Sequence, residues 1–166
     1  RLYYRFKEGH IPTCRNILQV VSSIQTKESV KFYRDALQDE RLANDAFQYV
    51  SNLGKEAIPL LVGILVKHKK EAFIKQSSQA LGKIGEEAVP AILEAFLKAD
   101  VLAQENLSLA LIVIGSDARK HLLPLLNSSD PNVRLRIVKI LGKLKNPEDL
   151  SAFMKLLSDI PQIREE

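Results

Sequence analysis

The chain has 166 residues, a net charge of +4 at pH 7, and a composition that is 46% hydrophobic and 27% charged. These values are typical of a folded protein that forms one domain or one array of small units, and they exclude a disordered or collagen-like chain. The longest apolar run, residues 57–66, is about half the roughly 20 residues that a membrane-spanning helix needs, so we predict no membrane span.

The amino-terminal residues differ from the rest of the chain. We expect residues 1–11 to be the end of a preceding segment or helix, and because the chain begins without Met we expect it to be a piece of a longer protein. Cys14 is the only cysteine and cannot form a disulfide within the chain. We therefore expect a cytoplasmic location, either for a larger protein or for the soluble domain of a membrane-associated one.

A repeat of about 30 residues organises the sequence. Its marker is a turn glycine, present as Gly54, Gly85 and Gly115, with Lys145 in the fourth position. Apolar residues recur at fixed distances from this marker, three or four residues apart, as expected for one face of a helix. The clearest such positions are Val50, Leu81, Leu111 and Leu141 before the turn, and Leu65, Phe96, Leu126 and Leu156 after it.

These positions predict a repeat domain over residues 12–158, followed by a polar tail at 159–166. The domain divides into helical hairpins at about 12–38, 39–69, 70–99, 100–129 and 130–158. In the first unit we expect one buried stripe made of Ile17, Val20, Val21 and Ile24, and a second made of Phe32, Ala36 and Leu37.

Polar and proline residues mark where the helices begin. Asp39, Asp100 and Asp130 lie at or near the same position of successive units, where an aspartate can accept a hydrogen bond from the first turn of a helix. Pro124 lies within an otherwise helical run and should kink that helix or restart it. Sustained alternation of polar and apolar residues is absent, so we predict helices and no strands.

Two segments resemble a known repeat family. Residues 130–134 (DPNVR) and 140–144 (ILGKL) look like the first helix of a HEAT-like repeat, of the short bacterial kind also found in phycobilisome lyases. Residues 80–85 (ALGKIG) and 87–90 (EAVP) resemble the end of that helix and the start of the second. The resemblance implies an all-α fold: an α-solenoid, a right-handed superhelix of about five HEAT-like helical hairpins. It further implies first helices on the convex side and second helices on the concave side.

Residues with catalytic or metal-binding spacing are not found. The histidines, His10, His68 and His121, are far apart, and Cys14 has no spacing signature with any of them. The glycines of residues 82–85 lack the preceding strand and the Gly-Lys-Ser/Thr frame of a phosphate-binding loop. We therefore predict no enzyme activity, no catalytic residues, no metal and no cofactor.

Charge is distributed unevenly along the chain. Residues 86–117 contain six acidic residues and one basic residue, whereas residues 130–145 contain five basic residues and one acidic residue. These segments are either solvated helix faces or a bipolar surface that binds a charged partner. A nucleic-acid groove is a further alternative, although Trp is absent and the acidic segment interrupts the basic ones.

The first helix of the fourth unit carries more apolar residues than its neighbours do. Leu109, Ile112 and Val113 occupy positions that hold polar residues or glycine in other units. Either neighbouring helices cover these side chains, or they form a patch that binds a partner.

We accordingly predict a non-catalytic protein–protein interaction scaffold, a HEAT-repeat module of a larger protein that binds a protein partner. The candidate partner-binding residues are Arg134, Arg136, Lys139, Lys143, Leu109, Val113, Glu94 and Lys98. Two alternatives stay open: a subunit similar to the bilin lyases, as the resemblance implies, and a HEAT-like protein that binds nucleic acid.

Overall fold

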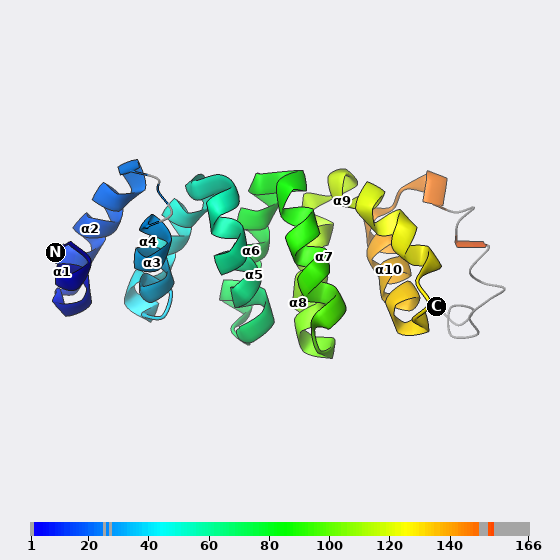
Figure 1. The fold of residues 1–166 in the computed structure, drawn as a ribbon, viewed down its shortest axis with the longest axis horizontal. Helices are drawn as coiled ribbons and strands as arrows, with labels where there is room; N and C mark the ends of the chain where they lie inside the picture. Colours follow the sequence, from blue (N-terminus) through cyan, green and yellow to red (C-terminus); the bar gives the residue numbers. More distant parts are fainter. Residues whose placement is uncertain (1, 25, 27, 150–152, 155–166) are drawn as a thin grey trace.

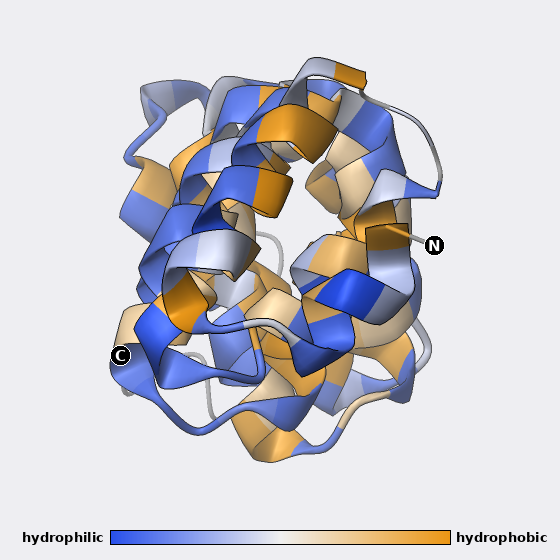
Figure 2. Ribbon diagram, turned by 90° about the vertical axis from the view of Figure 1, so that its left-hand side faces the viewer, coloured by the Kyte–Doolittle hydropathy of each residue, from blue (hydrophilic) through white to orange (hydrophobic). Residues whose placement is uncertain are grey.

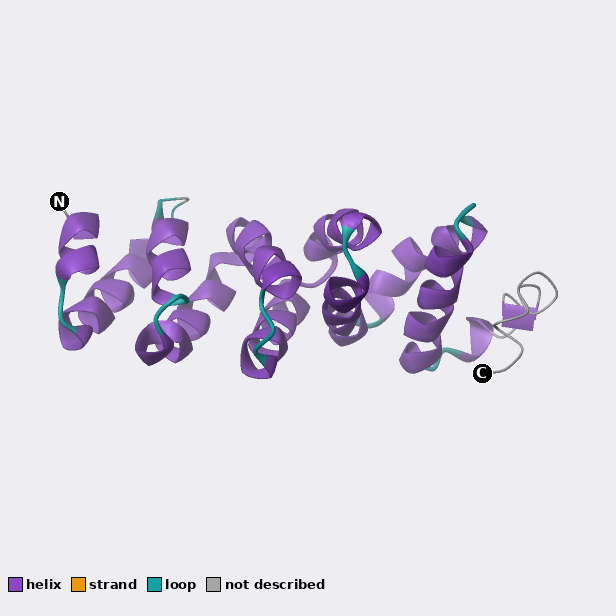
Figure 3. Cartoon of the chain, turned by 90° about the horizontal axis from the view of Figure 1, so that it is seen from below, coloured by secondary structure: helices purple, strands orange, loops and turns teal. Residues whose placement is uncertain are grey.

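The computed structural model describes residues 2–24, 26, 28–149 and 153–154. Within those residues the chain forms helices joined by short loops, and no strand is present (Figure 3). The α-helices are α1 (Leu2–Glu8), α2 (Ile11–Ile24), α3 (Ser29–Ala36), α4 (Glu40–Val50), α5 (Ile58–Lys67), α6 (Glu71–Ile84), α7 (Val89–Lys98), α8 (Val101–Ile114), α9 (Ser116–Leu122) and α10 (Pro131–Leu144). Four short 3-10 helices complete the set: η1 (Ser51–Ala57), η2 (Gly85–Ala88), η3 (Leu123–Asn127) and η4 (Pro147–Asp149).

The helices stack in a row of two layers (Figure 1). One layer consists of the first helices α4, α6, α8 and α10, and the other consists of the second helices α3, α5, α7 and α9 with η3. Helices of one hairpin pack against each other and against the next hairpin: α2 and α3 contact each other, and both contact α4. This arrangement is the predicted α-solenoid, in which stacked neighbours bury faces that a lone hairpin would expose.

The shared core lies between the layers, where the repeated apolar positions meet. Val50, Leu81, Leu111 and Leu141 are completely buried, which confirms the position predicted before each turn. In the second helices Leu65 and Phe96 are also completely buried and Leu126 nearly so, while Leu156 lies outside the described residues. Viewed along the row, the helices nearest the viewer carry both hydrophobic and hydrophilic residues, as amphipathic helices do (Figure 2).

The turns explain the repeated glycines. Gly54, Gly85 and Gly115 all have positive φ, at 56°, 76° and 76°, with ψ between −130° and −140°. This combination is open to glycine and strained for other residues. Lys145 takes the fourth position with φ 53° and ψ 41°, the left-handed helical region that a residue with a side chain can occupy.

The stretch Glu40–Lys67 is long and apolar enough to cross a membrane if length and composition alone are considered. It is not one straight helix, because the backbone at Gly54 leaves helical geometry and separates α4 and η1 from α5. Nearly half of its most apolar window is buried in the core. This stretch therefore serves as a helical hairpin of the solenoid.

Capping residues begin several helices as predicted. The side chains of Asp39, Asp100 and Asp130 accept hydrogen bonds from backbone N–H groups two or three residues further on, at 2.9–3.0 Å. Pro124 ends the regular α-helix α9 and lies in the first turn of η3. The predicted restart at Pro124 is confirmed.

The first hairpin differs from its prediction. Val20 and Ile24 are exposed, whereas α2 buries Leu18 and Cys14 together with the predicted Ile17 and Val21. The buried stripe of α2 is therefore Cys14, Ile17, Leu18 and Val21, and the preceding helix α1 also packs on α2. α1 adds Tyr3 and Phe6, whose rings lie 5.1 and 5.6 Å from that of Phe32 in edge-to-face contacts. The predicted burial of Phe32, Ala36 and Leu37 is confirmed.

Candidate functional site

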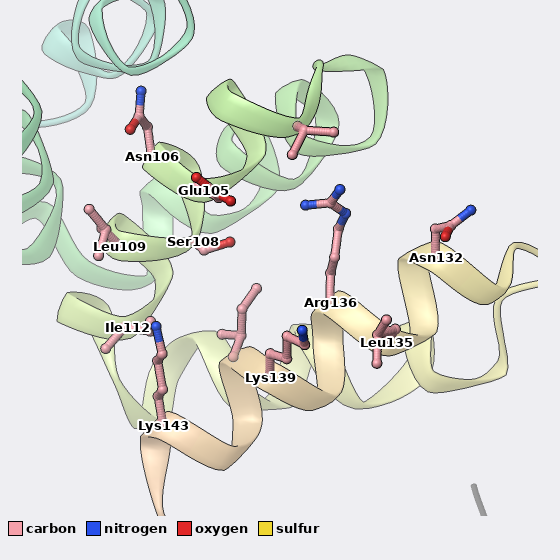
Figure 4. A pocket seen from close by; sticks show the side chains of 12 residues that line it. Glu105, Asn106, Ser108, Leu109, Ile112, Asn132, Leu135, Arg136, Lys139 and Lys143 are labelled. Atoms are coloured by element: carbon pink, nitrogen blue, oxygen red, sulfur yellow. The ribbon is translucent and has the colours of Figure 1, made fainter. Parts of the chain in front are cut away.

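A groove of about 610 Å³ runs between α8 and α10 in the layer of first helices. Figure 4 shows α8 and α10 side by side with side chains from both directed into the space between them. The lining residues are Val101, Glu105, Asn106, Ser108, Leu109 and Ile112 from α8, and Asn132, Leu135, Arg136, Lys139, Ile140 and Lys143 from α10. We call this the α8–α10 groove.

The α8 wall of this groove carries a row of aliphatic side chains beside the polar residues Glu105, Asn106 and Ser108. Val101 and Leu109 are 60% and 44% exposed, and Ile112 is half-buried. These three residues are eight and three positions apart, so they follow one side of the helix. Leu135 continues the apolar surface from α10. The groove thus exposes aliphatic side chains that the core does not need.

The α10 wall carries the positive charge. Arg136, Lys139 and Lys143 lie three and four residues apart and therefore on one face of the helix. Within the described residues no salt bridge involves Arg136 or Lys143. Glu105 on the opposite wall is the one acidic side chain among the lining residues. The lining residues consequently carry a net positive charge, and the basic stripe of α10 lies beside the aliphatic row of α8.

The groove opens because of two residues at the contact between the helices. At the preceding contact, between α6 and α8, Gly82 lies against the side chain of Val113, so closely that a Cβ at Gly82 would overlap Cγ1 of Val113. One repeat later Ile112 stands in place of Gly82, and Lys143 stands in place of Val113. Both side chains line the α8–α10 groove, and Figure 4 shows Lys143 extending toward Ile112. A glycine permits close approach of two backbones, whereas an isoleucine facing a lysine separates them.

Polar contacts hold α8 and the end of α10 in place on either side of the groove. The buried Asn106 donates a hydrogen bond from Nδ2 to the carbonyl oxygen of Leu65 at 3.0 Å, which fixes α8 to the end of α5. Beyond α10, Arg119 contacts the buried carboxylate of Asp149 through Nε at 2.8 Å and Nη2 at 2.7 Å. The same Nη2 lies 3.3 Å from Glu148, and the hydrogen bond and the ion pairs raise the pKa of Arg119.

The groove brings together four of the eight candidate residues: Leu109, Arg136, Lys139 and Lys143. Arg134 lies outside it and donates from Nη1 to the carbonyl oxygen of Ser128 at 2.5 Å. Val113 is half exposed but packs on Gly82 and borders a second groove, between α4 and α6.

The remaining pair of candidate residues, Glu94 and Lys98, lies on α7 in the other layer. Its side chains are exposed and form an ion pair with Oε1 and Nζ 2.7 Å apart. The hydrogen bond from Lys98 lowers the pKa of Glu94. A pair that is four residues apart on one exposed helix face is typical of local helix stabilisation, and it does not extend the groove.

Several lining residues were not among the candidates. Leu135 could have been found by the criterion that selected Leu109, because the corresponding positions in the two preceding first helices hold Lys75 and Glu105. Ser108 and Asn132 carry no such signal, since exposed polar residues are ordinary on helices. Their place in the groove follows from the packing of α8 beside α10.

Two further grooves border other helix pairs. One of about 680 Å³ lies between α3 and α5 and includes Lys31, Arg34 and Lys67 beside Glu56. The other, of about 1090 Å³, lies mainly between α4 and α6 and has a mostly polar lining that includes Lys83. In the part of the chain that the structure describes, the α8–α10 groove joins exposed aliphatic residues to the predicted basic stripe, whereas Val30, Leu37, Leu60 and Ile64 in the α3–α5 groove are partly or fully buried.

Among the described residues, no group of three His, Cys, Asp or Glu side chains could hold a metal ion. His121 lies 3.2 Å from Glu86, and His68 lies against the ring of Phe73. The thiol of Cys14 is buried, which raises its pKa, and it lies near the carbonyl oxygens of Phe6 and Gly9. These contacts are those of packed structural residues.

The comparison with protein families agrees with this geometry. The family model for HEAT repeats matches residues 103–166, which include most of α8 and all of α9 and α10. This part of the chain is therefore similar to HEAT repeats, which agrees with the stacked helical hairpins of the fold. Proteins with such repeats are generally scaffolds for protein interactions, because stacked hairpins present extended binding surfaces. The comparison with curated proteins found no match.

Proposed function

We propose that this HEAT-like chain is a non-catalytic scaffold that binds a protein partner through the α8–α10 groove. The observation that carries the proposal is the convergence of Leu109, from α8, with Arg136, Lys139 and Lys143, from α10, on one surface. Residues some 30 positions apart in the chain thus form a single amphipathic site. A cytoplasmic location for this scaffold stays a prediction.

The composition of the groove supports a protein partner. Protein interfaces combine an apolar centre with hydrogen-bonding and charged groups at the rim, and the groove has Leu109, Ile112 and Leu135 beside Arg136 and Ser108. Single-stranded nucleic acids bind by stacking bases on aromatic side chains along a basic channel. No aromatic residue is present among those that line the groove.

Site-specific photo-cross-linking in a lysate of cells that contain the protein would test the proposal. A photoreactive amino acid replaces Leu109 in the groove or, as a control, the exposed Glu87 at the start of the η2–α7 segment. We expect discrete protein adducts from position 109 and none from position 87. Mass spectrometry would identify the adducts, and an excess of unlabelled protein should compete them away.

Other results would contradict the proposal. If position 109 gave no protein adduct, or gave adducts that nuclease treatment removes, the groove would not be a protein-binding site. Turnover of a small-molecule or nucleic-acid substrate by the purified chain would contradict the non-catalytic role.

A further inference from the structure

We infer that the occupant of the α8–α10 groove is an acidic amphipathic α-helix. This inference rests on the proposed function and names the chemistry of the partner. The occupant would place a row of carboxylates along the basic stripe of α10 and an adjacent row of aliphatic side chains against the apolar wall of α8.

The spacing of the basic side chains is the first reason. Arg136, Lys139 and Lys143 form a stripe on one helix face, and Arg136 and Lys143 are about 10 Å apart along the axis at 1.5 Å per residue. A second helix that lies along α10 offers the same repeat when it carries carboxylates at positions i, i+3 or i+4, and i+7. A helix packed along α10 would thus place one carboxylate opposite each of the three basic side chains.

The apolar wall is the second reason. Val101, Leu109 and Ile112 face the groove from α8 along the same length. Exposed aliphatic residues beside a charged stripe complement a helix whose apolar and acidic stripes are adjacent. Burial of aliphatic surface would supply affinity, and the charges would set the register and exclude basic helices.

The backbone of the groove walls is the third reason. Both walls are α-helices, whose central N–H and C=O groups already bond within the helix. An extended peptide normally binds by adding to the free edge of a sheet, and no strand occurs in the described part of the chain. A helical occupant satisfies its own backbone hydrogen bonds and needs only side-chain contacts from the groove.

The inference can be tested with a designed peptide. A fluorescein-labelled helical peptide of about 18 residues would carry Glu at i, i+3 and i+7 beside a stripe of Leu, and its binding to the whole chain would be followed by fluorescence anisotropy. We expect saturable binding that weakens at least tenfold in the double variant K139E/K143E and at least tenfold in L109E. Circular dichroism would show that both variants keep the helical fold.

A matched control uses the equivalent position of another repeat. Lys83 is the residue of α6 that corresponds to Lys143, and it lines the α4–α6 groove. The variant K83E makes the same change of charge as K143E, and we expect it to alter the affinity less than twofold. A peptide of identical composition in scrambled order should bind at least tenfold more weakly.

Specific results would overturn the inference. Equal binding of the scrambled peptide would reduce the interaction to non-specific attraction, and loss of binding in R34E/K67E instead would place the peptide in the α3–α5 groove. If a single-stranded oligonucleotide bound more tightly than the peptide, and K139E/K143E abolished that binding, the occupant of the groove would be a nucleic acid and not a helix. If the peptide fails while position 109 still cross-links to a protein, the acidic helix is wrong and the scaffold role stands.

Discussion

Two neighbouring contacts in the layer of first helices differ in how closely the helices approach. α6 and α8 pack along much of their length, with Val113 against Gly82, whereas α8 and α10 leave a groove lined by Ile112 and Lys143. The repeat positions are the same in both contacts. A small residue facing an aliphatic one closes the contact, and a large aliphatic residue facing a cation opens it.

The contact of α4 and η1 with α6 is open as well, although no large aliphatic residue stands there. Ser51 and Lys83 occupy the corresponding positions, and both line the groove of about 1090 Å³. A lysine therefore stands at both open contacts and a valine at the closed one. In a solenoid whose core positions are nearly uniform, these outward positions differ between the contacts that are open and the one that is closed.

The largest effect is expected at the ion pair between Arg119 of α9 and Asp149 of η4, which follows α10. Arg119→Ala would leave the buried carboxylate of Asp149 without its cation, and an uncompensated buried charge destabilises a fold strongly. Urea unfolding at neutral pH would measure this loss of stability. The conservative variant R119K should lose less, because it keeps the charge but not both hydrogen bonds. A change below about 0.5 kcal/mol in R119A would mean that this ion pair does not hold α10.

A smaller effect is expected at the closed contact. Gly82→Val would force α6 and α8 apart, since a side chain at Gly82 overlaps that of Val113. Overpacking of this kind costs about 1–3 kcal/mol, to be measured by urea unfolding. Adding V113A to G82V should recover part of the loss, because it makes room for the new side chain.

Gly142 is the matched control for Gly82. It occupies the same repeat position in α10, but a Cβ there would meet no atom within 4 Å. Gly142→Ala should therefore stabilise the protein by about 0.5–1 kcal/mol, the gain in helix propensity alone. Equal effects of substitution at the two glycines would contradict the difference between closed and open contacts.

The smallest effect is expected at Glu86, which lies in η2 after α6 and contacts α9 after α8. Nζ of Lys120 and Nε2 of His121 lie 2.5 and 3.2 Å from Oε1 of Glu86, and these hydrogen bonds lower the pKa of Glu86 from its ordinary 4.5. A lowered pKa in the folded state contributes stability above the ordinary pKa, and that contribution is lost as the pH falls through the folded value. Glu86→Gln should therefore reduce the loss of stability between neutral pH and acid below 4.5.

Unfolding experiments at several pH values would measure this difference. Lys120→Met removes the first donor to Glu86 and should reduce the acid dependence in part. The same dependence in the wild type and in E86Q would show that these contacts add nothing to stability.

Much of the fold could be predicted from the sequence because its signals are local and repeated. The helix starts at Asp100 and Asp130 and the glycine turns at Gly85 and Gly115 each depend on a few adjacent residues. Leu111 and its equivalents were predicted to be buried because an apolar residue recurs at that position of every unit. One unit alone would not have shown this recurrence.

The candidate site was predicted only in part. Unusual residues at repeat positions selected Leu109 and the stripe of Arg136, Lys139 and Lys143 as candidates, and the structure brings these four residues to one groove. The residue pattern could not show that Val113 packs on Gly82, or that Arg134 donates a hydrogen bond to the carbonyl oxygen of Ser128. The expected burial of Val20 and Ile24 in the first hairpin was wrong, because α2 buries the stripe that begins one turn earlier, at Cys14.

The sequence by itself determined the helices, their pairing and the buried stripe, since capping, glycine turns and a 3.6-residue period act within one or two turns of chain. Only the tertiary structure decided which contact opens, because the distance between two helices depends on the pair of side chains that meet there. Ile112 and Lys143 are about 30 residues apart in the chain and adjacent in the groove. Their meeting creates the surface on which the proposed function depends.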